Sequence, residues 1–218
     1  GAFTNTALDK MLMQLIALDP GFKFLRVGRA SDSQELAEML DDPAEYFSED
    51  LTERFRSVHD YRKKVESVRV MAATAHRAAT SSIVRLRQFE MSIVDEAAQL
   101  TEPLTLALIL RGRRFILIGD DRQLPPVVRN RELAQSMFER LKQESGRYTL
   151  LEEQYRMHPD IMNLSNQLFY DGQLRSGVQA IDRTFVDGTP VEFVPVFSDD
   201  SPARRNAAEA EAVTRRAK

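Results

Sequence analysis

Short apolar runs alternate with amphipathic stretches along most of this 218-residue chain. The apolar runs are rich in β-branched or aromatic residues and lead into polar residues; they cover 68–73, 89–94, 115–118 and 149–151. Helical periodicity lies between them, notably over 102–110 and 131–143. This alternation predicts an α/β fold with a parallel sheet. Because the runs are continuously apolar, we expect their strands to be buried on both faces.

Helix-start signals place further elements. The polar residues 4–6 offer N-caps for a first helix. A charged helix is predicted over 48–64, and Pro159 suits the first turn of another. In the last part of the chain, the pattern predicts a strand over 191–196 and a helix over 206–217.

The composition excludes several kinds of protein. Without cysteine the chain has no disulfides, thiolate metal sites or cysteine nucleophiles, which fits a reducing compartment. A bacterial cytoplasm or nucleoid is favoured, and a eukaryotic nucleus stays open. No apolar run reaches the ~18 residues of a membrane span, and Asp9 and Lys10 interrupt the first apolar stretch, so we expect no membrane partner and no signal peptide. The net charge of −3 argues against a nucleic-acid binder that uses its whole surface, but it permits a local groove for a single strand.

Two adjacent carboxylates, Asp95 and Glu96, follow the apolar run at 89–94. Ligands of open α/β sheets bind at the carboxyl ends of the strands. There, one carboxylate can hold Mg²⁺ and the next can orient or deprotonate an attacking water. Taken alone, such a pair is more often a solvated acidic turn.

A second polar cluster follows the run at 115–118. It begins with Gly119 and Asp120, and Gln123 comes three residues later, before a double proline that stiffens the loop. A glutamine in this place can sense the terminal phosphate or the attacking water, as in other nucleotide hydrolases. An ordinary Gly-Asp turn is an equal alternative.

A third cluster contains Arg156, which stands between the run at 149–151 and the helix predicted to start at Pro159. Such an arginine can reach a γ-phosphate across a domain cleft. A surface salt bridge is the commoner role of a single arginine.

The order and spacing of the three clusters resemble superfamily 1 helicases, and most of all the branch that holds the nonsense-mediated-decay RNA helicase and the replication helicase–nuclease. VDEAAQ is similar to motif II of that family, GDDRQLPP to motif III and EQYRMHPDI to motif IV. AFTNTALD at 2–9 resembles motif Ia, and MAATA at 71–75 stands where the next nucleic-acid contact motif is expected. The resemblance extends over nearly the whole chain.

The resemblance implies a RecA-like P-loop NTPase fold with a parallel sheet flanked by helices. Residues 1–148 would be part of a first RecA-like ATPase domain, with a helical insert over about 30–67. Residues 149–218 would be the N-terminal part of a second RecA-like domain.

ATP and Mg²⁺ are the cofactors that the resemblance implies. Asp95 would coordinate Mg²⁺ and Glu96 would activate water. Gln123 would couple the γ-phosphate to the nucleic-acid groove, on the loop that Gly119 and Asp120 begin.

The second domain would supply Arg156 as a finger on the γ-phosphate and Tyr155 beside the adenine base. The chain contains no G-x-x-x-x-G-K-[ST] motif, whose amides and lysine cradle the β- and γ-phosphates. In relatives this loop lies just upstream of motif Ia. We therefore expect that the chain is a fragment, and that alone it neither hydrolyses ATP nor unwinds duplexes.

Single-stranded DNA or RNA is the implied partner. Thr4, Asn5 and Thr74 would hydrogen-bond its backbone, which positions a strand without reading its sequence. His76 and Arg77 are further candidates for the same groove. The three histidines of the chain are scattered, and they predict no metal site.

These features favour part of an ATP-dependent helicase that couples ATP hydrolysis to movement on a single strand. A degenerate helicase-like scaffold without ATPase activity is the main alternative. A P-loop enzyme of another kind, such as a kinase, would leave QYRMHP unexplained.

Overall fold

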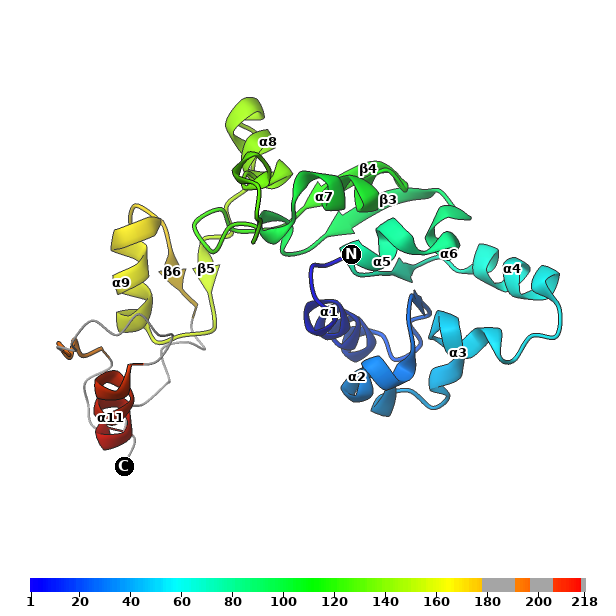
Figure 1. Ribbon diagram of the computed structural model, residues 1–218, viewed down its shortest axis with the longest axis horizontal. Coiled ribbons are helices and arrows are strands. Elements are labelled where there is room, and N and C mark those ends of the chain that lie inside the picture. Colours follow the sequence, from blue (N-terminus) through cyan, green and yellow to red (C-terminus); the bar gives the residue numbers. More distant parts are fainter. Residues whose placement is uncertain (178–190, 197–205, 217–218) are drawn as a thin grey trace. The chain divides into compact units, whose positions relative to one another are not determined.

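The computed structural model describes residues 1–177, 191–196 and 206–216 (Figure 1). It divides into two compact units, Gly1–Tyr148 and Thr149–Lys218. The resemblance implies a boundary between two RecA-like domains at the same place, and the identity of the two units as these domains stays a prediction. Within the described ranges, no helix combines the length and apolar character that crossing a membrane requires.

A parallel sheet forms the centre of the first unit. Its strands are β1 (Leu25–Arg26), β2 (Met71–Ala72), β3 (Phe89–Val94) and β4 (Gly112–Leu117). β1 pairs with β2 and β3 pairs with β4, all in parallel register. Gly1 and Ala2 join the two pairs, because Gly1 hydrogen-bonds the backbone of Ile93 and Asp95 while Ala2 bridges to Thr74. The order across the sheet is therefore β1, β2, the first two residues, β3 and β4.

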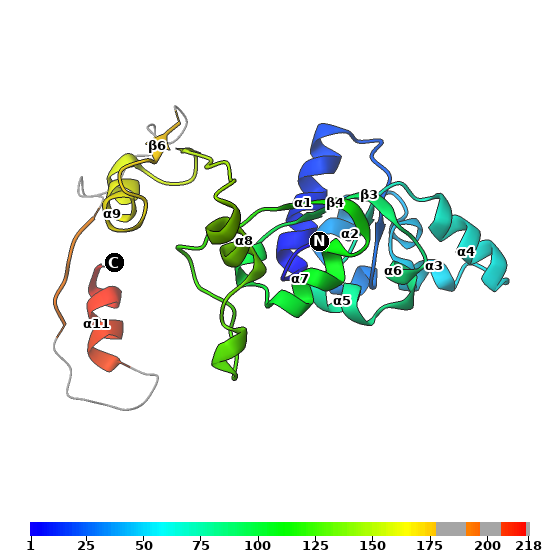
Figure 2. The same cartoon turned by 90° about the horizontal axis from the view of Figure 1, so that it is seen from above.

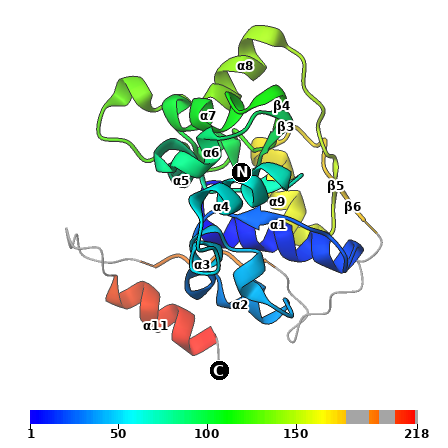
Figure 3. The same cartoon turned by 90° about the vertical axis from the view of Figure 1, so that its right-hand side faces the viewer.

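Helices lie on both faces of the β2 part of this sheet (Figure 1, Figure 3). The α-helices of the first unit are α1 (Asn5–Leu18), α2 (Gln34–Glu38), α3 (Ser48–Thr52), α4 (Val58–Ser67), α5 (Ala75–Thr80), α6 (Ser82–Arg85), α7 (Glu102–Ile109) and α8 (Met137–Ser145). Neighbouring residues of a strand point to opposite faces. Ala72 accordingly packs into the apolar cluster of α1, and Ala73 packs into the cluster of α5 and α7.

One face of the β3–β4 pair remains exposed. Val94 and the Ser92 hydroxyl lie against α7. Met91, Ile93 and Ile116 point to the opposite face, where they are 39%, 43% and 45% exposed. The expectation of strands buried on both faces is therefore wrong for this pair, because helices of the described residues cover only the α7 side.

The segment expected to be a helical insert is helical, but it is broken. A single helix expected over 48–64 is instead α3 and α4, which lie next to one another at one end of the unit (Figure 2). The break occurs because the Ser57 hydroxyl accepts a hydrogen bond from the His59 backbone and starts a new helix. Leu51 of α3 and Val65 of α4 then share one apolar cluster with Leu25.

Several other bounds differ from those expected. The run at 131–143 forms a short 3₁₀ turn and then α8, which Ser136 caps and Gly146 ends in a left-handed conformation. The strand expected over 68–73 is shortened to β2. The strand expected over 149–151 is absent from that stretch, and β5 (Glu153–Gln154) follows it instead. A strand extends only as far as a neighbouring strand hydrogen-bonds to it, and an apolar run in the sequence does not show where that neighbour lies.

The second unit contains one short parallel pair and two helices in its described part. β5 pairs with β6 (Arg175–Ser176), α9 spans Pro159–Phe169, and α11 spans Ala207–Arg216. Pro159 is the first residue of α9, as predicted. Residues 191–196 form no strand, so that prediction is wrong.

Candidate functional site

Four polar segments lie at the carboxyl edge of the sheet in the first unit. Thr4–Asn5 follows the first two residues, and Thr74–Arg77 follows β2. Asp95–Glu96 follows β3, and Gly119–Gln123 follows β4. Because the pairing is parallel, every segment leaves the same edge. This is the edge at which open α/β sheets bind ligands.

The two carboxylates after β3 are half-buried and firmly held. Glu96 has φ 54° and ψ 35°, a left-handed conformation that is rare for a residue other than glycine. Its Oε2 accepts a hydrogen bond from Nε2 of Gln99 at 2.9 Å. The Asp95 backbone amide donates to the Gly1 carbonyl at 2.8 Å.

The loop after β4 packs tightly against the loop after β3. A Cβ at Gly119 would lie 2.8 Å from the backbone nitrogen of Ala98, so only glycine fits there without a shift. Asp120 accepts a hydrogen bond from Nε2 of Gln123 at 2.9 Å, and Lys142 of α8 pairs with Asp121 at 2.7 Å. These contacts hold Gln123 at the same edge as Asp95.

Thr4 and Thr74 play the same local role. Thr4 caps α1 by accepting from the Ala7 amide at 3.1 Å, and Thr74 caps α5 by accepting from the Arg77 amide at 3.3 Å. A capping hydroxyl still has a hydrogen to donate. Thr4 is exposed, whereas Thr74 is only 7% exposed, which leaves little of its surface for a ligand. The Ala2–Thr74 bridge brings the two segments side by side.

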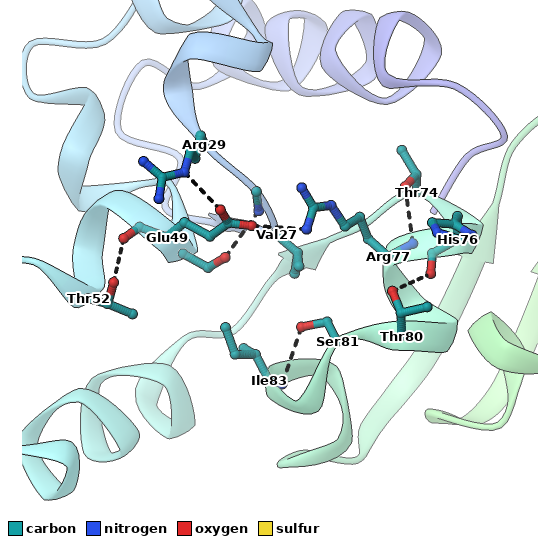
Figure 4. Close-up of polar contacts among 12 residues, drawn as sticks. Val27, Arg29, Glu49, Thr52, Thr74, His76, Arg77, Thr80, Ser81 and Ile83 are labelled. Atoms are coloured by element: carbon teal, nitrogen blue, oxygen red, sulfur yellow. Dashed lines mark hydrogen bonds and ion pairs between the residues drawn. The ribbon is translucent and has the colours of Figure 1, made fainter.

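Arg77 reaches away from Thr74 toward α3 (Figure 4). Its guanidinium lies 3.0 Å from Glu49, which also pairs with Arg29 at 3.0 Å. The two arginines are about half exposed, and Arg29 also lies 3.9 Å from Glu53, so the two arginines and the two glutamates balance in charge. His76 is exposed, and its carbonyl accepts from Thr80.

In the second unit, Gln154 shapes the loop that carries Tyr155 and Arg156. Its Oε1 accepts from the backbone amides of Arg156 and Met157, both at 2.9 Å, and its Nε2 donates to the Met157 carbonyl and the Ser176 hydroxyl. Within the described ranges, the Arg156 side chain has no hydrogen-bond or ion-pair partner.

Tyr155 is 52% exposed, and its ring lies against Gly177. A Cβ at Gly177 would lie 2.1 Å from Cε1 of that ring. The hydroxyl donates to Glu153 at 2.5 Å, and this hydrogen bond raises the pKa of Tyr155.

Comparison with known proteins decides the family. An AAA domain model matches residues 31–131, and a second AAA domain model matches residues 133–217. The chain is 36% identical over 187 residues to the DNA replication ATP-dependent helicase/nuclease DNA2 of Gallus gallus. The aligned region covers 83% of this chain and 18% of the length of that protein. The chain belongs to the superfamily 1 helicases. Its fold is therefore RecA-like α/β.

Two further relatives extend the comparison. The helicase/nuclease JHS1 of Arabidopsis thaliana is 35% identical over 89% of the chain, and the 5'-3' DNA helicase ZGRF1 of Mus musculus is 32% identical over 89%. The chain spans 14% and 12% of the lengths of these helicases.

Sequence reasoning missed three residues of this chain that hold the segments of the site. Gln154 stands inside a recognised motif, so its place could have been noticed. Glu49 and Arg26 stand outside the motifs that carry the resemblance, and single charged residues give no signal there. In the described part of the chain, no group of three or more metal-ligating side chains forms.

Proposed function

We propose that these residues form part of an ATP-dependent helicase that moves along single-stranded DNA. One observation carries the proposal: the segments matching helicase motifs Ia, II and III, although far apart in sequence, leave one edge of one parallel sheet. This arrangement supports the proposal that nucleotide chemistry and strand contact take place on neighbouring loops. The relatives' names describe DNA helicases, which favours DNA over RNA as the strand that is bound.

The side chains at this edge fit part of an ATP–Mg²⁺ site. Mg²⁺ is usually held by one or two carboxylates together with phosphates and waters, and Asp95 supplies one such carboxylate. Mg²⁺ would neutralise charge on the phosphates. Glu96, held by Gln99, would accept the proton of the attacking water, and Gln123, held by Asp120, would orient it. In the second unit, Arg156 would contact the γ-phosphate and Tyr155 the adenine.

The sequence contains no phosphate-binding P-loop motif, so the β- and γ-phosphates would be held by residues other than these 218. We propose that the 218 residues alone do not hydrolyse ATP. The same lack of a P-loop motif is what favours the second candidate, a helicase-like scaffold.

Strand separation tests the proposed function. A forked DNA duplex would carry a fluorophore on one strand and a quencher on the other. The full-length protein should separate its strands only when ATP and Mg²⁺ are both present. A matched RNA fork should be separated more slowly. Separation of the RNA fork alone would contradict the DNA assignment. No separation of either fork, with intact single-strand binding, would favour the scaffold.

A further inference from the structure

Arg26 is a buried cation on β1, where it is 1% exposed. Burying a guanidinium is costly unless its donors are satisfied. Here Nε donates to Oδ1 of Asp9 at 3.0 Å, and Nη1 donates to the Val27 carbonyl at 2.7 Å. The remaining contact is to a predicted nucleic-acid residue: Nη2 donates to Oδ1 of Asn5 at 2.8 Å.

This contact fixes the chemistry of Asn5. Arginine only donates hydrogen bonds, so the Asn5 carbonyl oxygen must face Arg26. The amide nitrogen of Asn5, with its two hydrogens, must then face away, and Asn5 is exposed. A phosphate oxygen is an acceptor, so the outward group is the one that a nucleic-acid backbone requires.

The surroundings are shaped to hold Arg26 in place. Asn5 and Asp9 are four residues apart on α1, so they share one face and Arg26 spans its first turn. Gly28 passes beneath the guanidinium with φ +139°, and a Cβ there would lie 2.7 Å from Nη1. The Gly28 amide donates to the fully buried Ser48 hydroxyl at 3.1 Å.

We propose that Arg26 is a positioning residue that holds Asn5 as a hydrogen-bond donor toward the phosphate backbone of a single strand. This inference rests on the proposed helicase function. The competing role is purely structural, in which Arg26 only neutralises buried Asp9. The two roles differ in whether the effect of changing Arg26 depends on Asn5.

A double-mutant cycle separates the two roles. Arg26→Lys keeps a positive charge beside Asp9, but a lysine ammonium does not reproduce the planar guanidinium fork. Affinity for a fluorescein-labelled oligo(dT) single strand would be measured by anisotropy in the full-length protein, with thermal unfolding alongside. Losing a hydrogen bond to a charged group corresponds to about a tenfold loss of affinity or more.

We expect Arg26→Lys and Asn5→Ala each to lower the affinity about tenfold, and the double variant to bind no more weakly than Asn5→Ala alone. Arg54→Lys, at an exposed arginine paired with Asp42, is the matched control and should bind as the wild type does. If Arg26→Lys lowered the single-strand affinity by the same factor in the wild type and in Asn5→Ala, the positioning role would be wrong. Unchanged affinity in the Arg26→Lys single variant would also overturn it.

A second variant leaves the buried arginine untouched. Asn5→Asp still offers Arg26 an acceptor, so the melting temperature should not fall, but the outward donor is lost and affinity should drop at least tenfold. Wild-type affinity in Asn5→Asp would overturn the inference. A wild-type protein that binds no single strand would contradict the proposed function itself, and the positioning role with it.

Discussion

Replacing Glu96 with glutamine should lower the ATP turnover number of the full-length protein by about 10²–10⁴-fold while ATP affinity stays unchanged. Glutamine cannot accept the proton of the attacking water. It keeps an amide oxygen where Oε2 of Glu96 now accepts from Gln99, so the loop should hold its shape. Turnover would be measured by phosphate release, and affinity by equilibrium binding of a fluorescent ATP analogue.

Glu90→Gln provides the matched control for this prediction. Glu90 lies on the same strand and is exposed, with an ion pair to Arg113 at the surface. It should turn over ATP as the wild type does. If Glu96→Gln hydrolysed ATP normally, the assignment of Glu96 as the base would be wrong.

Arg156→Ala should lower turnover by about 10³-fold or more, because an arginine on the γ-phosphate stabilises charge in the transition state. Stability should not change, since the described residues offer the side chain no partner, while Gln154 holds the Arg156 backbone. Turnover and the melting temperature would be measured on the same preparation. Arg156→Lys should restore little, because lysine lacks the planar fork.

Arg175→Ala is the control in the second unit. Arg175 is exposed and lies 3.7 Å from Glu152, a surface pair worth little stability. Its turnover should match that of the wild type. Full activity in Arg156→Ala would remove Arg156 from the nucleotide site.

Local patterns in the sequence predicted the elements around the site well. Thr4 caps α1 and Pro159 begins α9, because capping and proline effects depend on a few neighbouring residues. The β3 strand matches its expected bounds for a similar reason, since a six-residue apolar run is itself the strand. Motif spacing placed Asp120 beside Gln123, and the structure joins them by a hydrogen bond.

Contacts between distant segments were not predictable in this way. Arg26 and Asn5 are separated by 21 residues, and the pairing of β1 with β2 together with the Ala2–Thr74 bridge brings them together. The exposed face of Met91 and Ile93 was missed because an apolar run does not show whether a second helical layer covers it. Thr74 matched a contact motif, yet burial limits its accessible surface.

ATP hydrolysis by the full-length protein, with and without single strands, tests whether these residues belong to a nucleic-acid motor. We expect Mg²⁺-dependent hydrolysis that single-stranded DNA stimulates strongly, because the residues proposed for nucleotide and strand binding leave one edge of the sheet. Stimulation should weaken in Asn5→Ala. Absence of hydrolysis under every condition would contradict the account and favour a scaffold that keeps these motifs for binding.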